Sequence, residues 1–367
     1  MTDIEYMKMA LELAARGCGS VNPNPMVGAV IVKNGEVIGR GFHEQCGKAR
    51  AERRALADCT APPDGATIYV TLEPCCHHGK TPPCTDAVIE SGIRRVVVGS
   101  GDPNPLVAGR GIEILRQNGI EVTEGVLREE CDRLNEVFFH FIKTGTPFVV
   151  MKYAMTADGK IATFSGKSKW ITGEAARRRV HADRNRYTGI MAGVGTVLAD
   201  DPMLDCRLAE GRNPVRIICD TNLRTPLDSN VVKTAKSQKT IIAACRAAEA
   251  RILPYRDLGC EILILPERGG HMDLKALMAA LGEMKIDSLL LEGGAALNWS
   301  ALESGIVSRV QTYIAPKLFG GADAKSPVGG DGIADPNAAF RLTTPVVTFL
   351  DGDLLLESEV IPCSRES

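Results

Sequence analysis

The chain has 367 residues, enough for two domains that each bury a full core. Its formal net charge is −2 and its pI is about 6.3, so composition gives no electrostatic reason to expect nucleic acid or a membrane surface as partner. Twelve cysteines are spread along the chain and do not form the compact pattern of a disulfide framework. No apolar run approaches the length of a membrane span. We therefore expect a cytoplasmic protein with reduced thiols that acts on a small soluble molecule.

Alternating helix and strand patterns characterise the first part of the chain. Residues 1–17 place apolar side chains at helical spacing behind acidic residues, which indicates an amphipathic helix and not a signal peptide. Asn34-Gly35 predicts a hairpin turn. Strands are expected at 27–32, 37–41, 66–72 and 95–99, and helices at 49–59, 85–91, 112–118 and, as one closing helix, 128–143. This order predicts a layered α/β domain.

The stretch TLEPCCHHGKTPPC, at residues 71–84, places metal-binding side chains directly behind an expected buried strand. Cys75 and Cys84 are separated by eight residues, and prolines stiffen the loop between them, so two thiolates could bind one zinc ion. A pair of buried free cysteines is the simpler alternative. Two histidines inside the loop favour the metal.

Arg50 and Glu52 stand where a zinc deaminase carries a His-x-Glu motif. In that motif the histidine binds the metal, and the glutamate moves a proton from zinc-bound water to the leaving ammonia. A solvated helix residue is the alternative for Glu52. Arg50 departs from the motif, because a protonated guanidinium has no lone pair for a metal. The nearby candidates for a substitute ligand are His43, Cys76, His77 and His78.

These stretches together resemble the bifunctional riboflavin-biosynthesis deaminase/reductase family. The shared motifs are NPNPMVGAV, Glu52, TLEPCCHHGKTPPC, DPNPLVAGRG, DGKIAT, SKWIT, GTVLADDP and LEGG. They extend over nearly the whole chain, and the long cysteine spacing is more specific than the two-residue spacing of generic deaminases. The resemblance implies an N-terminal cytidine-deaminase-like α/β/α domain at residues 1–145 and a dihydrofolate-reductase-like α/β domain at 146–367. Helix-breaking residues at 144–147 suit such a boundary.

By this resemblance the first domain binds one Zn²⁺ and deaminates 2,5-diamino-6-ribosylamino-4(3H)-pyrimidinone 5′-phosphate. The implied residues are Cys75 and Cys84 for the metal, Glu52 for proton transfer, and Asn24, His43 and Lys80 for the substrate. Without the family, Asn24 would be part of a stiff Asn-Pro turn, His43 a surface histidine and Lys80 a solvated loop lysine.

The second domain is expected to begin with a strand at 148–155 and to continue with a helix at 173–187 and strands at 189–192 and 288–291. It has no Gly-x-Gly-x-x-Gly fingerprint, so a Rossmann nucleotide site is not supported. Acidic residues dilute the arginine-rich helix, which favours a solvated face over nucleic-acid binding. Gly293-Gly294 could offer backbone N–H groups to a phosphate, although a plain strand-to-helix turn is the alternative.

The resemblance implies that this second domain reduces the ribosyl chain with NADPH, giving 5-amino-6-(5-phosphoribitylamino)uracil. The residues implied beside the cofactor are Ala154, Trp170, Thr196, Asp200 and Gly294. Those implied around the substrate are Lys152, Ser168, Arg184, Leu204, Arg207 and Glu292. The family forms homo-oligomers, so a homo-oligomer is implied as well.

Three other hypotheses stay open. One is a reductase whose deaminase domain is impaired by Arg50 in the place of the zinc-binding histidine. A second is a zinc-dependent nucleic-acid binder on a deaminase core, which predicts a basic groove and salt-sensitive binding, whereas this chain is near neutral. A third is a non-catalytic zinc module whose folding depends on the metal.

Overall fold

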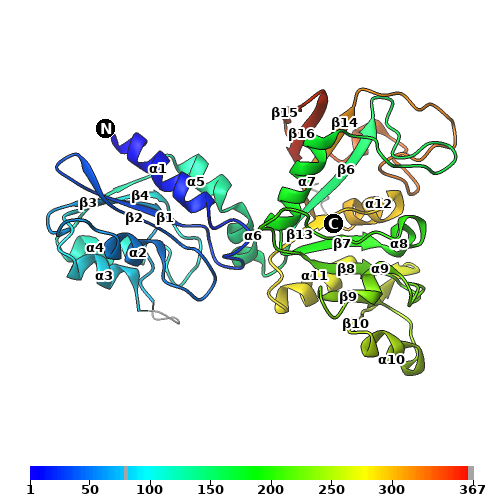
Figure 1. Ribbon diagram of the computed structural model, residues 1–367, viewed down its shortest axis with the longest axis horizontal. Helices are drawn as coiled ribbons and strands as arrows, with labels where there is room; N and C mark the ends of the chain where they lie inside the picture. Colours follow the sequence, from blue (N-terminus) through cyan, green and yellow to red (C-terminus); the bar gives the residue numbers. More distant parts are fainter. Residues whose placement is uncertain (78–81, 363–367) are drawn as a thin grey trace. The chain divides into compact units, whose positions relative to one another are not determined.

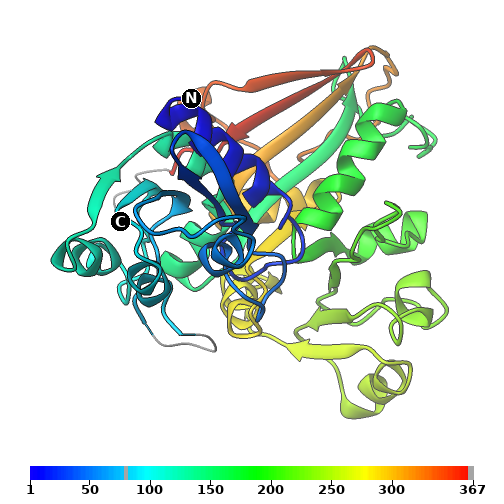
Figure 2. The ribbon, with the colours of Figure 1, turned by 60° about the vertical axis from the view of Figure 1, so that its left-hand side comes forward.

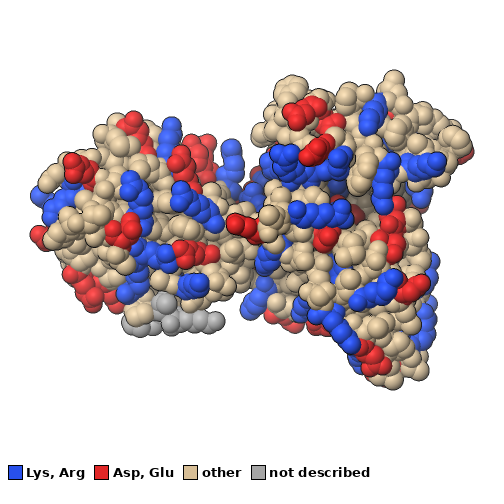
Figure 3. All heavy atoms as spheres, viewed as in Figure 1, with Lys and Arg blue, Asp and Glu red and all other residues tan. Residues whose placement is uncertain are grey.

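The computed structural model describes residues 1–77 and 82–362, and the chain divides into two compact units, Met1–Gly145 and Thr146–Ser367 (Figure 1). None of the helices in the described ranges combines the length and apolar character needed to cross a bilayer. On the face drawn in Figure 3, basic and acidic side chains intermingle over both units, in line with the small net charge.

A five-stranded sheet forms the centre of the first unit, in the order β2-β1-β3-β4-β5. Its strands are β1 (Gly28–Lys33), β2 (Glu36–Phe42), β3 (Thr67–Leu72), β4 (Arg95–Ser100) and β5 (Glu121–Glu124). β1 runs antiparallel to β2 and β3, whereas β3, β4 and β5 are parallel. The β1–β2 hairpin turns at Asn34 and Gly35, with φ of 52° and 81°. This confirms the Asn-Gly turn, whose two central residues need positive φ.

Helices cover both faces of this sheet, because successive side chains of a strand point to opposite sides. Ala29 and Ile31 pack into one core cluster, and Val30 and Val32 pack into another. The helices of the first cluster are α2 (Ala51–Ala57), α3 (Cys84–Glu90) and α4 (Arg110–Gln117); those of the second are α1 (Asp3–Ala15) and α5 (Arg128–Leu134). The unit is a three-layer α/β/α arrangement, as Figure 1 shows.

The expected single helix at 128–143 is wrong. Two helices, α5 and α6 (Glu136–Thr144), meet at Asn135, whose φ of −103° and ψ of 17° depart from helical values. The Asn135 side chain is buried, accepts a hydrogen bond from the Met26 N–H at 2.8 Å and donates one to the Met26 carbonyl at 3.0 Å. The helix breaks where this contact anchors the segment that leads into β1.

A nine-stranded sheet forms the centre of the second unit, in the order β10-β9-β8-β7-β13-β6-β14-β16-β15. All neighbours are parallel except β14–β16 and β16–β15. Figure 2 shows β6, β14 and β16 as long strands side by side. The strands are β6 (Phe148–Thr156), β7 (Gly189–Gly193), β8 (Val215–Cys219), β9 (Thr240–Ala244), β10 (Glu261–Ile264), β13 (Ser288–Leu291), β14 (Val307–Ala315), β15 (Val346–Leu350) and β16 (Asp353–Glu359); β11 (Glu267–Arg268) and β12 (His271–Met272) form a separate pair.

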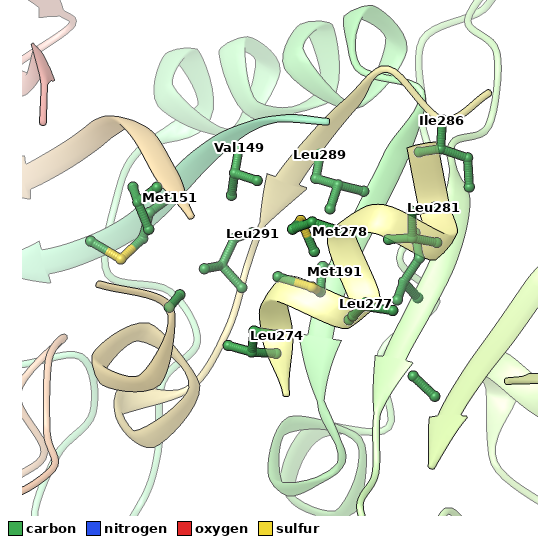
Figure 4. Packing of buried hydrophobic residues seen from close by; sticks show 14 of the residues in the cluster. Val149, Met151, Met191, Leu274, Leu277, Met278, Leu281, Ile286, Leu289 and Leu291 are labelled. Atoms are coloured by element: carbon green, nitrogen blue, oxygen red, sulfur yellow. The ribbon is translucent and has the colours of Figure 1, made fainter. Parts of the chain in front are cut away.

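The largest core cluster of this unit packs helix α11 (Leu274–Glu283) onto the sheet. Figure 4 shows Leu289 and Leu291 of β13 turned toward Leu277 and Met278 of the helix. β13 is buried along its whole length, as is typical of a parallel strand with helices on both faces. The other helices are α7 (Glu174–Arg186), α8 (Val194–Asp200), α9 (Asn230–Lys233), α10 (Glu249–Asp257) and α12 (Ala295–Glu303), with a short 3₁₀ turn, η1 (Pro336–Ala338).

Candidate active sites

A cavity of about 1450 Å³ opens in the second unit where β7, β8 and β13 end. Gly193, Cys219 and the segment 292–294 mark those strand ends and line the cavity. Open α/β sheets bind ligands outside the carboxyl ends of their strands, where loops and helix starts converge. The cavity is therefore where the fold favours a binding site.

All eleven residues that the resemblance assigned to the second domain line this cavity. They are Lys152, Ala154, Ser168, Trp170, Arg184, Thr196, Asp200, Leu204, Arg207, Glu292 and Gly294. They come from β6, α7, α8, the start of α12 and the loops between them. The fold thus gathers residues that are far apart in the sequence around one space.

Glu292 is the centre of a partly buried ion cluster in the cavity. Arg184 donates from Nε to Glu292 Oε1 at 2.7 Å and from Nη2 to Oε2 at 3.1 Å, and Lys152 Nζ lies 3.4 Å from Oε2. Burial raises the pKa of Glu292, but Arg184 and Lys152 outweigh it and bring the pKa to about 2. The carboxylate is therefore ionised at neutral pH and holds both cations at the cavity wall.

His181 was not singled out from the sequence, yet it also lines the cavity, one helical turn before Arg184 on α7. Its Nδ1 accepts a hydrogen bond from the Arg207 backbone N–H at 3.3 Å. Burial, followed by the charges of Arg184 and Arg207, lowers the pKa of His181, so the imidazole is neutral at pH 7. Its spacing of three residues from Arg184 was the available signal, because such positions share a helix face.

Trp170 is 61% exposed at the cavity, with one contact to its ring and one to its backbone. The Arg177 guanidinium, also missed from the sequence, lies 4.8 Å from the ring centroid, a cation–π contact. Lys317 Nζ donates to the Trp170 carbonyl at 3.0 Å. The indole therefore offers a positioned flat surface to a ligand.

The start of helix α12 forms another part of the wall. Gly294 is its N-cap residue, and a Cβ added there would lie 3.6 Å from Thr196 Oγ1. At Gly293 an added Cβ would come within 2.9 Å of Asn298 Oδ1. The two glycines leave backbone N–H groups uncovered at a helix start, a place that suits an anionic ligand group.

In the first unit the structure brings Asn24 and His43 together. Asn24 Nδ2 lies 3.4 Å from His43 Nε2, and His43 Nδ1 lies 3.3 Å from the Ala49 carbonyl oxygen. Burial, together with the charge of Arg50, lowers the pKa of His43 although the Ala49 contact opposes it. Two groups able to bind a pyrimidine base thus lie beside the start of α2.

Glu52, Cys75 and Cys84 form a buried cluster in which Glu52 is 3%, Cys75 3% and Cys84 0% exposed. The Cys84 backbone N–H donates to Cys75 Sγ at 3.3 Å. The bond from Cys84 lowers the pKa of Cys75, whereas burial raises that of Glu52. Glu52 Oε2 is buried without a hydrogen-bond partner among the described residues.

Family models match both units. Residues 147–350 match the RibD C-terminal domain, and residues 1–100 match the cytidine and deoxycytidylate deaminase zinc-binding region. The riboflavin biosynthesis protein RibD of Actinobacillus pleuropneumoniae is 57% identical, over 98% of this chain and 96% of the relative. The chain belongs to the RibD family.

Further RibD proteins are similar to this chain over most of its length. That of Escherichia coli K12 is 42% identical over 89% of this chain and 90% of its own length. A solved structure from Thermotoga maritima, described as a diaminohydroxyphosphoribosylaminopyrimidine deaminase/5-amino-6-(5-phosphoribosylamino)uracil reductase, is 41% identical with a TM-score of 0.87, covering 98% of this chain and 99% of that one.

RibD membership confirms the expected fold class, a cytidine-deaminase-like domain followed by a reductase domain. It also identifies the chain as a bifunctional deaminase/reductase of riboflavin biosynthesis, in a family whose cofactors are Zn²⁺ and NADPH. The hypothesis of a reductase alone is not favoured, since both domains are present.

The donors that the structure describes in the first unit do not complete a zinc site. In residues 1–77 and 82–362, which include His43, Cys76 and His77, no three His, Cys, Asp or Glu side chains lie together as metal ligands. A catalytic zinc ion needs three protein ligands and an open position. Cys75 and Cys84 are the two expected thiolate ligands, and Arg50 stands in the sequence where the deaminase motif has the histidine. The candidates His78 and Lys80 lie outside the described residues.

Proposed function

We propose that residues 1–145 remove the 2-amino group of 2,5-diamino-6-ribosylamino-4(3H)-pyrimidinone 5′-phosphate. Residues 146–367 then reduce the ribosyl chain of the product to ribityl, giving 5-amino-6-(5-phosphoribitylamino)uracil. The observation that carries this proposal is the gathering of all eleven expected reductase residues around one cavity. Its volume exceeds the roughly 300–1,000 Å³ of ordinary small-molecule pockets and suits a dinucleotide together with a sugar phosphate.

NADPH would lie against Trp170, Thr196 and Gly294, with Ala154 and Asp200 completing its contacts. The exposed indole suits a planar ring, and the uncovered N–H groups at the start of α12 suit a phosphate. Bound NADPH supplies the hydride, and the task of the protein is to orient C1 of the open ribose toward it.

The substrate would lie at the charged end of the cavity. Ionised Glu292 holds Arg184 and Lys152 in place, so neither cation has to be ordered when substrate binds. The Arg207 guanidinium is half exposed and pairs with Asp205, and this exposure lets it turn to a phosphate. Ser168 and Leu204 complete the substrate wall.

In the first unit Asn24 and His43 would bind the pyrimidine, and Lys80 would bind the phosphate. Glu52 would take a proton from the attacking water and return it to the leaving ammonia. Its burial supports this role, because raising the pKa of a carboxyl group makes it a better proton carrier near neutral pH. Cys75 and Cys84 would supply two thiolate ligands.

We also propose a cytoplasmic homo-oligomer. β15 is the last strand of its sheet and exposes Val346, Val347 and Phe349. An edge strand with apolar side chains suits pairing with a second copy. Light scattering should give a mass above that of one chain, and Phe349→Glu should lower it.

Product formation tests the two activities separately. Loss of NADPH absorbance follows the reductase, and ammonia release follows the deaminase. Arg184→Ala should lower kcat/KM of the reductase by about 100-fold, as loss of a group that binds a charged substrate does. Lys239→Ala, a charge change at a surface ion pair with Glu261, is the matched control. An Arg184→Ala protein as active as the control would refute the substrate assignment.

A further inference from the structure

We propose that Arg50 blocks the third ligand position beside Cys75 and Cys84 and so weakens zinc binding by this chain relative to one with histidine there. The inference rests on the proposed function of the first unit, because it concerns the same site. It follows from where the backbone places Arg50, from the charges around it, and from the number of ligands that remain.

The position of Arg50 is fixed by helix α2. Arg50 is the N-cap residue, with φ of −78° and ψ of 166°, and its carbonyl accepts the first helical hydrogen bond, from the Arg54 N–H at 3.1 Å. The two residues that follow, Ala51 and Glu52, are buried against the sheet. Arg50 therefore stands at the end of α2 that carries Glu52.

The Arg50 charge acts on every titratable group of the cluster. It favours the charged forms of Glu52, Cys75 and Cys84, and it disfavours the charged forms of His43 and His77. A permanent cation thus lies within electrostatic range of the groups that would hold zinc. Because like charges repel, zinc can enter only by displacing the guanidinium or by binding beside it.

The cluster has a hydrogen bond of its own without a metal, since Cys75 Sγ accepts from the Cys84 backbone N–H. Glu52 Oε2 is the buried oxygen that lacks a partner among the described residues. The charge of Arg50 favours the ionised form of this carboxyl group, although burial outweighs it and raises the pKa of Glu52.

The number of remaining ligands determines how much zinc affinity is lost. Losing a residue that only orients a metal ligand typically costs about 10- to 100-fold in affinity, so losing a direct ligand costs at least as much. Replacing Arg50 with histidine should therefore raise zinc affinity by at least about 10- to 100-fold.

The test measures zinc bound to the purified full chain in zinc-buffered dialysis, with metal quantified by mass spectrometry. Arg50→His should hold one zinc per chain at free zinc concentrations at least about 10-fold below those the unmodified chain needs. Arg54→His is the matched control, since Arg54 lies on the same helix but pairs with Glu44 at 2.5 Å, and it should behave as the unmodified chain. Arg50→Cys, a second ligand-restoring variant, serves if the histidine variant does not fold.

Equal zinc affinity of the unmodified chain and the folded Arg50→His protein would overturn the proposal. Tight binding by the unmodified chain that is lost in His78→Ala would overturn it too, and would identify a ligand from the loop. NADPH oxidation by each variant checks that the second unit is intact. If Arg50→His gains tight zinc but releases no ammonia from the diaminopyrimidine nucleotide, the substrate assignment fails while the inference on Arg50 stands.

Discussion

The Arg184 guanidinium binds the Glu292 carboxylate through two parallel hydrogen bonds, of 2.7 and 3.1 Å, inside the cavity of the second unit. Lysine cannot reproduce this paired geometry. Arg184→Lys should lower the free energy of unfolding by about 1–3 kcal/mol, because one charge-assisted hydrogen bond is lost. Both tryptophans, Trp170 and Trp299, belong to the second unit, so their fluorescence during urea unfolding reports on this unit alone. An unchanged free energy of unfolding would show that the second hydrogen bond to Glu292 does not contribute to stability.

Acid should weaken the same ion cluster. The pKa of Glu292 is about 2 in the folded protein, against an ordinary value of 4.5, so the folded state binds this proton less tightly than the unfolded chain. The stabilisation is fully present above pH 4.5 and is lost as pH falls toward 2. Glu292→Gln should be less stable at pH 7 and should show a shallower fall in stability across this window. Tryptophan fluorescence measures both, and an unchanged acid slope would contradict the assignment.

The bond from the Arg207 backbone to His181 should make substrate binding sensitive to pH. Protonated imidazole has no lone pair to accept the Arg207 N–H, and the lowered pKa of His181 places this change below pH 6.5. KM for the phosphorylated substrate should rise about 2- to 10-fold as pH falls through this range, since such a bond contributes about 1 kcal/mol. His181→Phe should show the raised KM at all pH values. KM for NADPH serves as the control, and a persisting pH dependence in the variant would assign it to another group.

Glu73, at the end of β3, should stabilise the first unit. Its carboxylate accepts backbone N–H bonds from Asp102, Gly109, Gly111 and Ile112, at 3.0 to 3.3 Å. Glu73→Gln replaces one acceptor oxygen with a donor, which should cost about 1–3 kcal/mol because buried N–H groups lose their partner.

Hydrogen exchange of the amides at 109–112 measures this loss, and tryptophan fluorescence of the second unit should not change. Glu113→Gln, an exposed change in the same segment, is the matched control. Equal protection in the two variants would show that the loop does not depend on the Glu73 charge.

Motifs and local patterns predicted the strands and turns that are determined by residues close together in the sequence. The strand at 288–291 and the turn at Asn34-Gly35 follow from a run of apolar residues and from a dipeptide that accepts positive φ. The break at Asn135 could not be predicted, because it depends on Met26, 109 residues away. The order of the nine strands likewise depends on partners that are distant in sequence.

The same limit applies to the sites. The cavity residues that the resemblance supplied carry recognisable motifs, whereas His181 and Arg177 lie on a helix whose many arginines and polar residues give no motif. Their importance comes from what they contact, Arg207 and Trp170, and neither contact can be predicted from local pattern. Arg50 is the reverse case, because its departure from a motif is plain in the sequence alone.

The sheet order of the second unit has a consequence during synthesis on the ribosome. Among the strands of this sheet, β6 leaves the ribosome first. Both of its neighbours, β13 and β14, come from residues after 287. The first unit has every strand partner within its own 145 residues and can complete its sheet while the rest is still being translated. The apolar β6 must meanwhile wait for some 130 further residues without a partner, as the sheet order requires. Newly made chains therefore pass through a period in which one half is finished and the other exposes an aggregation-prone strand, the period in which chaperones would matter most.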